Sequence, residues 1–484
     1  MTRLDHSDIQ GLAAFGYKKL VEARFWLLRI RDRAAARQWL AAAPVSTAER
    51  KSTAPETALQ VAFTASGLRA IGLPDSVVAG FSAEFLSGMA GQENRSRRLG
   101  DAGASAPAKW LWGAAGKPID VAVMLYAKSN LSAWDQTVQK DPWNAAFEIV
   151  TTLDTTNMNG REPFGFVDGL SQPEYDWDRV TTPAATTASY NNRLAIGELL
   201  LGYPNEYNKY TDRPLLPPAG DPANRLLPAE DQTDFKDLGR NGTYLVLRQL
   251  EQDVRGLWQY LDRQAGGDLT KRYQLAASFV GRNLDGDAIV DVSNKDNSFT
   301  YANDPDGIKC PFGAHIRRAN PRNADLFGNP SGIMALFSRL GLPRPGLRDD
   351  LISSTRFHRL LRRGREYGVQ VPPDNALQPA PAGEPPSGLQ FACLCANILR
   401  QFEFVQGAWL MSTKFNGMTE ESDPLLGQRA AVGDCPVTGN FTIPRKDKAS
   451  QCLTGVPQFI TVRGGAYFFM PSLRALRYLT DGGH

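Results

Sequence analysis

A strand-then-helix pattern near the start of the chain returns in its middle. Residues 23–32, ARFWLLRIRD, are typical of a β-strand, and RAAARQWLAAA (33–43) follows with helix-forming alanines and an apolar Trp-Leu pair. In TYLVLRQLEQDVRGLWQYLDRQ (243–264) an apolar strand again ends near an arginine and continues into a helix. Two copies of one unit in one chain indicate an internal duplication.

Further segments repeat the same order of strand and helix. They are 59–74, 119–138, 389–410 and 466–479. Together these units predict a chain built from two α+β halves. Two long stretches rich in turn-forming residues, 174–241 and 371–387, interrupt the pattern. Loops of this length inside a compact protein usually have a function, so we expect them to wrap a site.

The charges of the chain are nearly balanced. Its 54 lysines and arginines stand against 51 acidic residues, which gives a net charge of +3 and no indication of a nucleic-acid or membrane surface. The N-terminal segment MTRLDHSDIQGLAAFGYKK lacks the apolar core of a signal peptide, and no later stretch has the roughly 18 uninterrupted apolar residues of a membrane span. We therefore expect a cytoplasmic protein with neither nucleic acid nor membrane as a partner.

Cysteine and histidine limit the chemistry that the chain can carry. The cysteines are odd in number and include no CxxC pair: Cys310, Cys393, Cys395, Cys435 and Cys452. This pattern argues against a disulfide framework and against a zinc site. The histidines are His6, His315, His358 and His484. HExxH, a P-loop and GxGxxG are all absent, which argues against a zinc peptidase, an ATPase and a dinucleotide-binding fold.

His315 lies in a segment with an unusual distribution of side chains. In KCPFGAHIRRANPRN (309–323) small and apolar residues precede the imidazole, and Arg317, Arg318 and Arg322 follow it. Such a segment suits an apolar ring with acidic substituents. Haem has this shape, because its iron takes an axial imidazole and its two propionates attract cations. The alternative is a hydrogen-bonded core histidine followed by solvated arginines.

A second arginine-rich segment is RFHRLLRRGREYG (356–368). We predict a helix here, ended by Gly364, in which Arg359, Arg362 and Arg363 have helical spacing around two leucines. At least one guanidinium is then carried inward, where it needs an anion. The alternative is a solvated helix face or a phosphate-binding patch.

A lone acid, Asp168, stands between apolar residues and a proline in GREPFGFVDGLSQPEYDWD (160–178). An Asp-Gly pair is a common turn, and that is the simplest interpretation. However, Phe164, Phe166 and Val167 would carry the carboxylate into an apolar setting, where it must be paired, hydrated or used in chemistry.

Taken together, these segments resemble the dye-decolorizing peroxidase family, in its longer cytoplasmic branch. The matching residues are Gly165, Asp168 and Gly169 in the GxxDG signature, His315 as the proximal haem histidine, Arg362 as the distal arginine, and Leu389 and Phe391 as the apolar lining over the haem. The resemblance extends over nearly the whole chain, from DIQG (8–11) to TVRGGAYFF (461–469).

The resemblance implies a fold and a cofactor. The expected fold is α+β, with two ferredoxin-like halves of the dimeric α+β barrel type, antiparallel sheets and peripheral helices. The first half would span 1–240 and carry the GxxDG motif and a long loop. The second would span 241–484 and hold haem b, that is, iron protoporphyrin IX.

It also implies an activity. Hydrogen peroxide would be reduced through an oxoferryl intermediate, and bulky aromatic donors such as dyes and phenols would be oxidised. Asp168 would be the proton carrier, Arg362 would stabilise the developing charge, and His315 would be the only iron ligand from the protein. If Arg362 does not supply that charge, Arg359 or Arg363 would take its place. The oligomeric state stays open between monomer and homodimer, and the physiological reductant stays unassigned.

Two further residues are candidates for the surroundings of the haem. Glu403, in the expected helix NILRQFEFVQGAW, is the candidate acceptor for the second ring nitrogen of His315, with a surface glutamate as the alternative. Arg322 is the candidate propionate partner. Glu366 departs from the family pattern, because proline is common at this position in relatives. The alternative function is a haem-handling protein that stores or delivers the cofactor, which would need His315 and the arginines but not Asp168.

Overall fold

The computed structural model describes residues 4–180, 193–293, 297–301, 303–322, 354–429 and 439–481. Cys435 and His484 lie outside these ranges. Among the described residues, no helix is both long and apolar enough to cross a lipid bilayer.

The first half of the chain contributes four long strands to the central sheet. They are β1 (Glu22–Ile30), β2 (Thr57–Phe63), β3 (Val121–Ala127) and β4 (Phe147–Asp154). All of their pairings are antiparallel, and their order across the sheet is β4-β1-β3-β2. Helices follow the strands as the sequence predicts, with α1 (Arg33–Ala42) after β1 and α6 (Leu131–Val138) after β3. This is the strand order of a ferredoxin-like unit.

The second half repeats this arrangement. Its strands are β9 (Thr243–Gln252), β10 (Leu361–Arg362), β11 (Arg365–Tyr367), β12 (Ser387–Cys395) and β15 (Ile460–Met470). They lie in the order β10-β12-β9-β15, with β11 also paired to β12, and every pairing is antiparallel. Strand β15 then pairs with β2 at Phe469 and Phe63, so the two sets form one continuous sheet. The expected α+β fold with two ferredoxin-like halves is confirmed, whereas the boundary at residues 240 and 241 stays a prediction.

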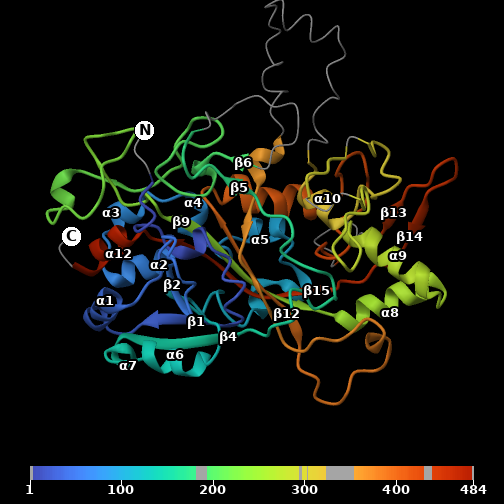
Figure 1. Cartoon of the computed structure of the whole chain (residues 1–484), viewed down its shortest axis with the longest axis horizontal. Coiled ribbons are helices and arrows are strands. Elements are labelled where there is room, and N and C mark those ends of the chain that lie inside the picture. The colour runs from blue at the N-terminus through green and yellow to red at the C-terminus, as the bar shows by residue number, and fades with distance from the viewer. Residues whose placement is uncertain are drawn as a thin grey trace, which may run out of the picture.

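Helices pack against the first set of strands and flank the second. Helices α8 (Val254–Ala265) and α9 (Leu269–Val280) lie beside that set, whereas α12 (Leu473–Asp481) packs against α1 (Figure 1). Within the described ranges, the remaining helices of more than three residues are α2 (Ala65–Ile71), α3 (Asp75–Val78), α4 (Ala83–Ser87), α5 (Glu93–Leu99), α7 (Trp143–Ala146), α10 (His315–Ala319), the 3-10 helix η7 (Ser354–His358), and the π-helices η9 (Leu399–Glu403) and η10 (Val405–Leu410). Short strand pairs join β5 (Glu174–Tyr175) to β6 (Arg193–Leu194), β7 (Leu215–Leu216) to β8 (Lys236–Asp237), and β13 (Phe441–Ile443) to β14 (Gln451–Leu453).

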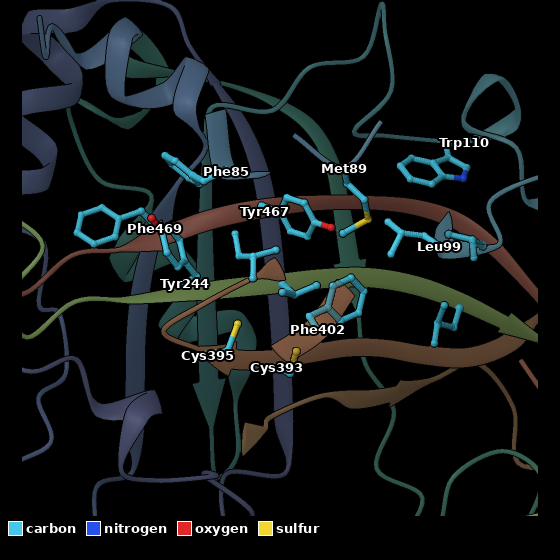
Figure 2. Packing of buried hydrophobic residues seen from close by; sticks show 14 of the residues in the cluster. Phe85, Met89, Leu99, Trp110, Tyr244, Cys393, Cys395, Phe402, Tyr467 and Phe469 are labelled. Carbon is cyan, nitrogen blue, oxygen red and sulfur yellow. The ribbon is translucent and has the colours of Figure 1, made fainter. Parts of the chain in front are cut away.

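Alternation along the strands produces a buried face on each side of the sheet. On β9, Tyr244 and Val246 belong to one hydrophobic cluster, and Leu245 and Leu247 belong to the other. Figure 2 shows the first cluster, with Tyr467 of β15, Tyr244 of β9 and neighbouring residues along adjacent strands. Further along β9 the same face carries Arg248, Leu250 and Gln252, and these three residues line a cavity.

One predicted element is wrong. The segment 356–368 does not form a helix, because it leaves the 3-10 helix η7 at His358 and continues into β10 and β11, which pair with β12. Arg362 therefore lies in a strand next to Cys393. Backbone pairing with a distant strand outweighs the helical spacing of the arginines.

Candidate active site

A large cavity lies on the face of the sheet formed by β9, β12 and β15. Strand residues that line it include Arg248, Leu250 and Gln252 of β9, Leu389 and Phe391 of β12, and Ile460 and Val462 of β15. Leu389 and Phe391 therefore line a cavity, as the resemblance implies. Among the described residues, none from 174–241 or 371–387 lines it, so the expectation that these loops wrap the site is wrong for the part that the structure describes.

His315 lies at the first position of α10 and also lines the cavity. Its Nδ1 lies 2.9 Å from Oδ2 of Asp423, whose side chain is fully buried. Desolvation lowers the pKa of His315, but the Asp423 carboxylate more than compensates, and the net shift is upward. Because Nδ1 is held by Asp423, Nε2 is the ring nitrogen left for the cavity, and it has no hydrogen bond to any residue within the described ranges.

Asp423 is itself held in place. Its Oδ1 accepts hydrogen bonds from the backbone N–H groups of Leu425 (2.9 Å) and Leu426 (2.8 Å). Burial raises the pKa of Asp423, but His315, the Leu426 N–H and the charge of Arg318 lower it by more, so the net shift is downward and the group stays a carboxylate. Asp423 was not among the residues predicted from the sequence. The segment SDPLL (422–426) indicates a turn, but no sequence signal connects it to His315.

Glu403 is not the partner of His315, which corrects the sequence-based assignment. Its Oε1 lies 2.8 Å from Nε of Arg95 and accepts a hydrogen bond from Tyr467, and its Oε2 accepts one from Arg98 at 3.1 Å. Glu403 ends the π-helix η9, and its neighbours Phe402 and Val405 line the cavity while it does not. Glu403 therefore links α5, which carries Arg95 and Arg98, to Tyr467 of β15.

Asp168 and Arg362 form an ion pair in the wall of the same cavity. Nη1 of Arg362 donates to Oδ1 of Asp168 at 2.9 Å, and the backbone N–H of Arg362 donates to Gln172 at 3.0 Å. The two side chains keep 36% and 38% of their surface exposed. Desolvation raises the pKa of Asp168, but Arg362 and the Gly169 N–H lower it, and the net shift is downward. Asp168 is therefore a carboxylate that stays ionised and accessible from the cavity.

The other arginines singled out in the sequence have three different surroundings. Arg322 and Arg359 line the cavity, whereas Arg363 does not and donates to the backbone carbonyl of Leu12. Arg317 and Arg318 are buried and bind protein oxygens, Arg317 through Asp304 and Cys310 and Arg318 through three backbone carbonyls. They hold α10 in place and do not face the cavity.

Arg282 adds a positive charge to the cavity wall that the sequence did not predict. Arg282 lines the cavity beside Arg322, and both guanidiniums lie over the ring of Phe299. Arg282 donates to neutral oxygens of Gly286 and Asn297. Burial, and then the charges of Arg322 and Arg362, lower the pKa of Arg282 to about 10. The guanidiniums of Arg282 and Arg322 therefore place two positive charges at this edge of the cavity.

His358 also lines the cavity, but its ring is engaged elsewhere. It stacks on Phe404, with ring centroids 3.7 Å apart, and its Nδ1 lies within hydrogen-bonding distance of the Arg400 carbonyl. His315 is thus the imidazole with a carboxylate behind it. One held imidazole, apolar walls and clustered guanidiniums suit a flat apolar cofactor that carries a metal and acidic substituents.

Comparison with known proteins gives similar sequences and structures that are named dye or DyP-type peroxidases. The chain is 32% identical over 344 residues to the multifunctional dye peroxidase DyP2 of an Amycolatopsis species, across 68% of this chain and 62% of that protein. It is 27% identical to the dye-decolorizing peroxidase msp1 of Mycetinis scorodonius, across 98% and 87% of the two chains. A solved DyP-type peroxidase of Auricularia auricula-judae superposes with a TM-score of 0.73 at 25% identity, across 99% of this chain and 100% of that one. No protein-family model matches the chain.

Proposed function

The chain belongs to the dye-decolorizing peroxidase family, and from this premise we propose that it is a haem peroxidase that reduces hydrogen peroxide and oxidises bulky aromatic donors such as dyes and phenols. The cofactor proposed is haem b. The observation that carries the proposal is the Asp168–Arg362 ion pair, which lines the same cavity as the imidazole of His315.

The residues around the cavity fit haem. Nε2 of His315 would ligate the iron, and the apolar side chains of Leu389 and Phe391 would pack on the macrocycle. Arg322, with Arg282 beside it, would neutralise the propionates. When bound, haem supplies an iron that binds peroxide and takes up its oxidising equivalents. The Asp423 carboxylate would orient the imidazole and make it a stronger donor.

Asp168 would carry the proton. A general base must be ionised and accessible, and Asp168 is both, since Arg362 lowers its pKa and part of its side chain is exposed. It would take the proton from the inner peroxide oxygen and return it to the outer one, which then departs as water. Glu366, which departs from the family pattern, interacts electrostatically with Asp168. The net pKa shift of Asp168 is nevertheless downward, so Asp168 stays ionised as a base requires.

Arg362 would stabilise the charge that develops on the departing oxygen. A guanidinium held by Asp168 and by a strand backbone is already oriented before reaction, and a preoriented charge lowers the barrier without further rearrangement. Arg359 is the neighbouring arginine on the cavity wall, and Arg363 faces elsewhere. Arg362 is thus better placed for this role than either.

The test uses the purified protein loaded with haem. Its rate of reaction with hydrogen peroxide, followed by stopped-flow absorption, should exceed that of an Asp168→Asn/Arg362→Leu double variant by at least about 10³. Steady-state oxidation of a phenol and of a bulky dye should fall in parallel. If both proteins bind haem equally and react with peroxide equally slowly, the alternative of haem storage or delivery replaces the peroxidase.

A further inference from the structure

Glu162 lines the cavity, and the proposed peroxidase reaction assigns it no function. It is partly buried and lies in the hairpin that carries Asp168. Burial raises its pKa to about 7, and the charge of Asp168 contributes to the same shift. The Glu162 carboxyl therefore lies within reach of the charge of Asp168.

The hairpin around Glu162 has a defined backbone. The Glu162 N–H donates to the Phe166 carbonyl at 2.9 Å, and the Asp168 N–H donates to the Gly160 carbonyl at 3.0 Å. The turn between the two arms closes through the Gly165 N–H and the Glu162 carbonyl at 2.8 Å, with Gly165 in the left-handed region at φ +102°. Asp168 stands at the end of the returning arm, so the shape of the hairpin sets its position.

The Glu162 side chain folds back over this turn and accepts three hydrogen bonds. The N–H groups of Phe164 and Phe166 donate to Oε2 and Oε1, both at 3.0 Å. Nε2 of Gln252 donates to Oε2 at 2.9 Å. A carboxylate can satisfy three donors at once because both of its oxygens only accept. A glutamine at this position would present an NH2 group to one of them.

Gln252 is the last residue of β9, the strand at the floor of the cavity. Its bond to Glu162 therefore ties a hairpin of the first half of the chain to the sheet of the second. Oε1 of Gln252 is buried and has no hydrogen-bond partner among the described residues. If the amide rotates by half a turn, this oxygen can accept the proton of a protonated Glu162, so the tie persists in both protonation states.

We infer that Glu162 is a positioning residue, which fixes Asp168 over the cavity by holding the hairpin turn and tying it to Gln252. The inference rests on the proposed function, since it assigns a second residue to the same proton transfer. Glu162 acts through Asp168 and has no role of its own in the reaction. Its effect should vanish when Asp168 can no longer carry a proton.

A double-mutant cycle on the haem-loaded protein tests this dependence. Glu162→Gln should slow the reaction with peroxide by at least about tenfold in the wild-type background, because small displacements of a reacting group are costly. In the Asp168→Asn background the same substitution should change the rate by less than about twofold. Haem absorption and imidazole binding to the iron should be unchanged, since neither needs a proton carrier.

Matched variants complete the design. In Glu22→Gln a carboxylate that accepts from the Leu131 N–H, far from the cavity, is altered in the same way, and the rate should not change in either background. If Glu162→Gln fails to fold or bind haem, Gln252→Leu replaces it, since it removes the tie and leaves the turn intact. The same slowing in both backgrounds, or none in either, would overturn the inference while the proposed function stands. A wild type no faster than Asp168→Asn would instead overturn the proposed function.

Discussion

Two aspartates, Asp423 and Asp168, serve the same cavity in different surroundings. Each lies 2.9 Å from a nitrogen of its partner, His315 or Arg362. The side chain of Asp423 is 0% exposed and also accepts two backbone N–H bonds, whereas that of Asp168 is 36% exposed. A fully enclosed carboxylate can hold and polarise its partner, but it cannot exchange protons with a substrate. The difference in burial thus separates a carboxylate that orients from one that can react.

The largest effect is expected at the imidazole that Asp423 holds. His315→Ala should abolish stable haem binding or reduce peroxidase activity to background, because it removes the proposed iron ligand. The measurement is the haem absorption spectrum after reconstitution and gel filtration. The control is His358→Ala, which should keep the spectrum because its ring stacks on Phe404. A histidine-ligated spectrum in His315→Ala would move the ligand to His358.

Next in size is the loss of the exposed carboxylate. Asp168→Asn should slow the reaction with peroxide by roughly 10²–10⁴, the usual contribution of a general acid or base. Because Arg362 lowers the pKa of Asp168, wild-type activity should persist into mild acid and decline as the pH falls through that lowered pKa. The measurement is the pH profile of the peroxide step, taken apart from dye oxidation. An identical acid limb in Asp168→Asn would show that another group titrates.

Removal of the partner charge should have a somewhat smaller effect. Arg362→Leu should slow the peroxide step by about 10²–10³ above the acid limb, as the loss of one stabilising charge usually does. The acid limb should also move to higher pH, since Asp168 loses the cation that lowers its pKa. Stopped-flow rates across pH measure both effects. Arg363→Leu is the control, and its rate should equal that of the wild type. If Arg363→Leu slows the peroxide step and Arg362→Leu does not, Arg363 is the arginine that stabilises the developing charge.

The smallest effect is expected when the enclosed carboxylate is made neutral. Asp423→Asn keeps a side-chain oxygen near Nδ1 of His315 but loses the charge, so haem affinity should fall by about 10- to 100-fold. Transfer of haem to apomyoglobin measures this affinity. Glu403→Gln alters the carboxylate first assigned to this role, and it should leave the spectrum of the His315-ligated iron unchanged. If Glu403→Gln lowers haem affinity and Asp423→Asn does not, Asp423 is not the carboxylate that orients His315.

Local patterns predicted much of the fold and part of the site. The units at 23–43 and 243–264 became β1–α1 and β9–α8, because apolar strands and alanine-rich or capped helices are specified by neighbouring residues. The segment 356–368 could not be predicted this way. Its leucines and arginines fit a helix locally, and only pairing with β12 selects the extended form.

In the site, too, some residues could be predicted from the sequence and others depend on contacts between distant segments. Resemblance indicated Asp168, His315 and Arg362, and all three line one cavity. Asp423 was missed because it is separated from His315 by 108 positions and looks like an ordinary turn residue in the sequence. Glu403 was chosen because its helix resembles the family's segment behind the haem, but its side chain binds Arg95 instead. Contacts between distant segments decide which acid faces which partner.

The position of β15 has a consequence for how the chain reaches this structure. Residues 460–470 come late in the sequence, yet they occupy the middle of the sheet between β9 and β2. While a ribosome extends the chain, β2 and β9 each keep an unpaired edge until β15 emerges, and exposed strand edges promote aggregation. Pairing between such distant segments is also slow. Slow expression at low temperature should therefore raise the yield of folded protein, and haem should be taken up only after translation has passed β15.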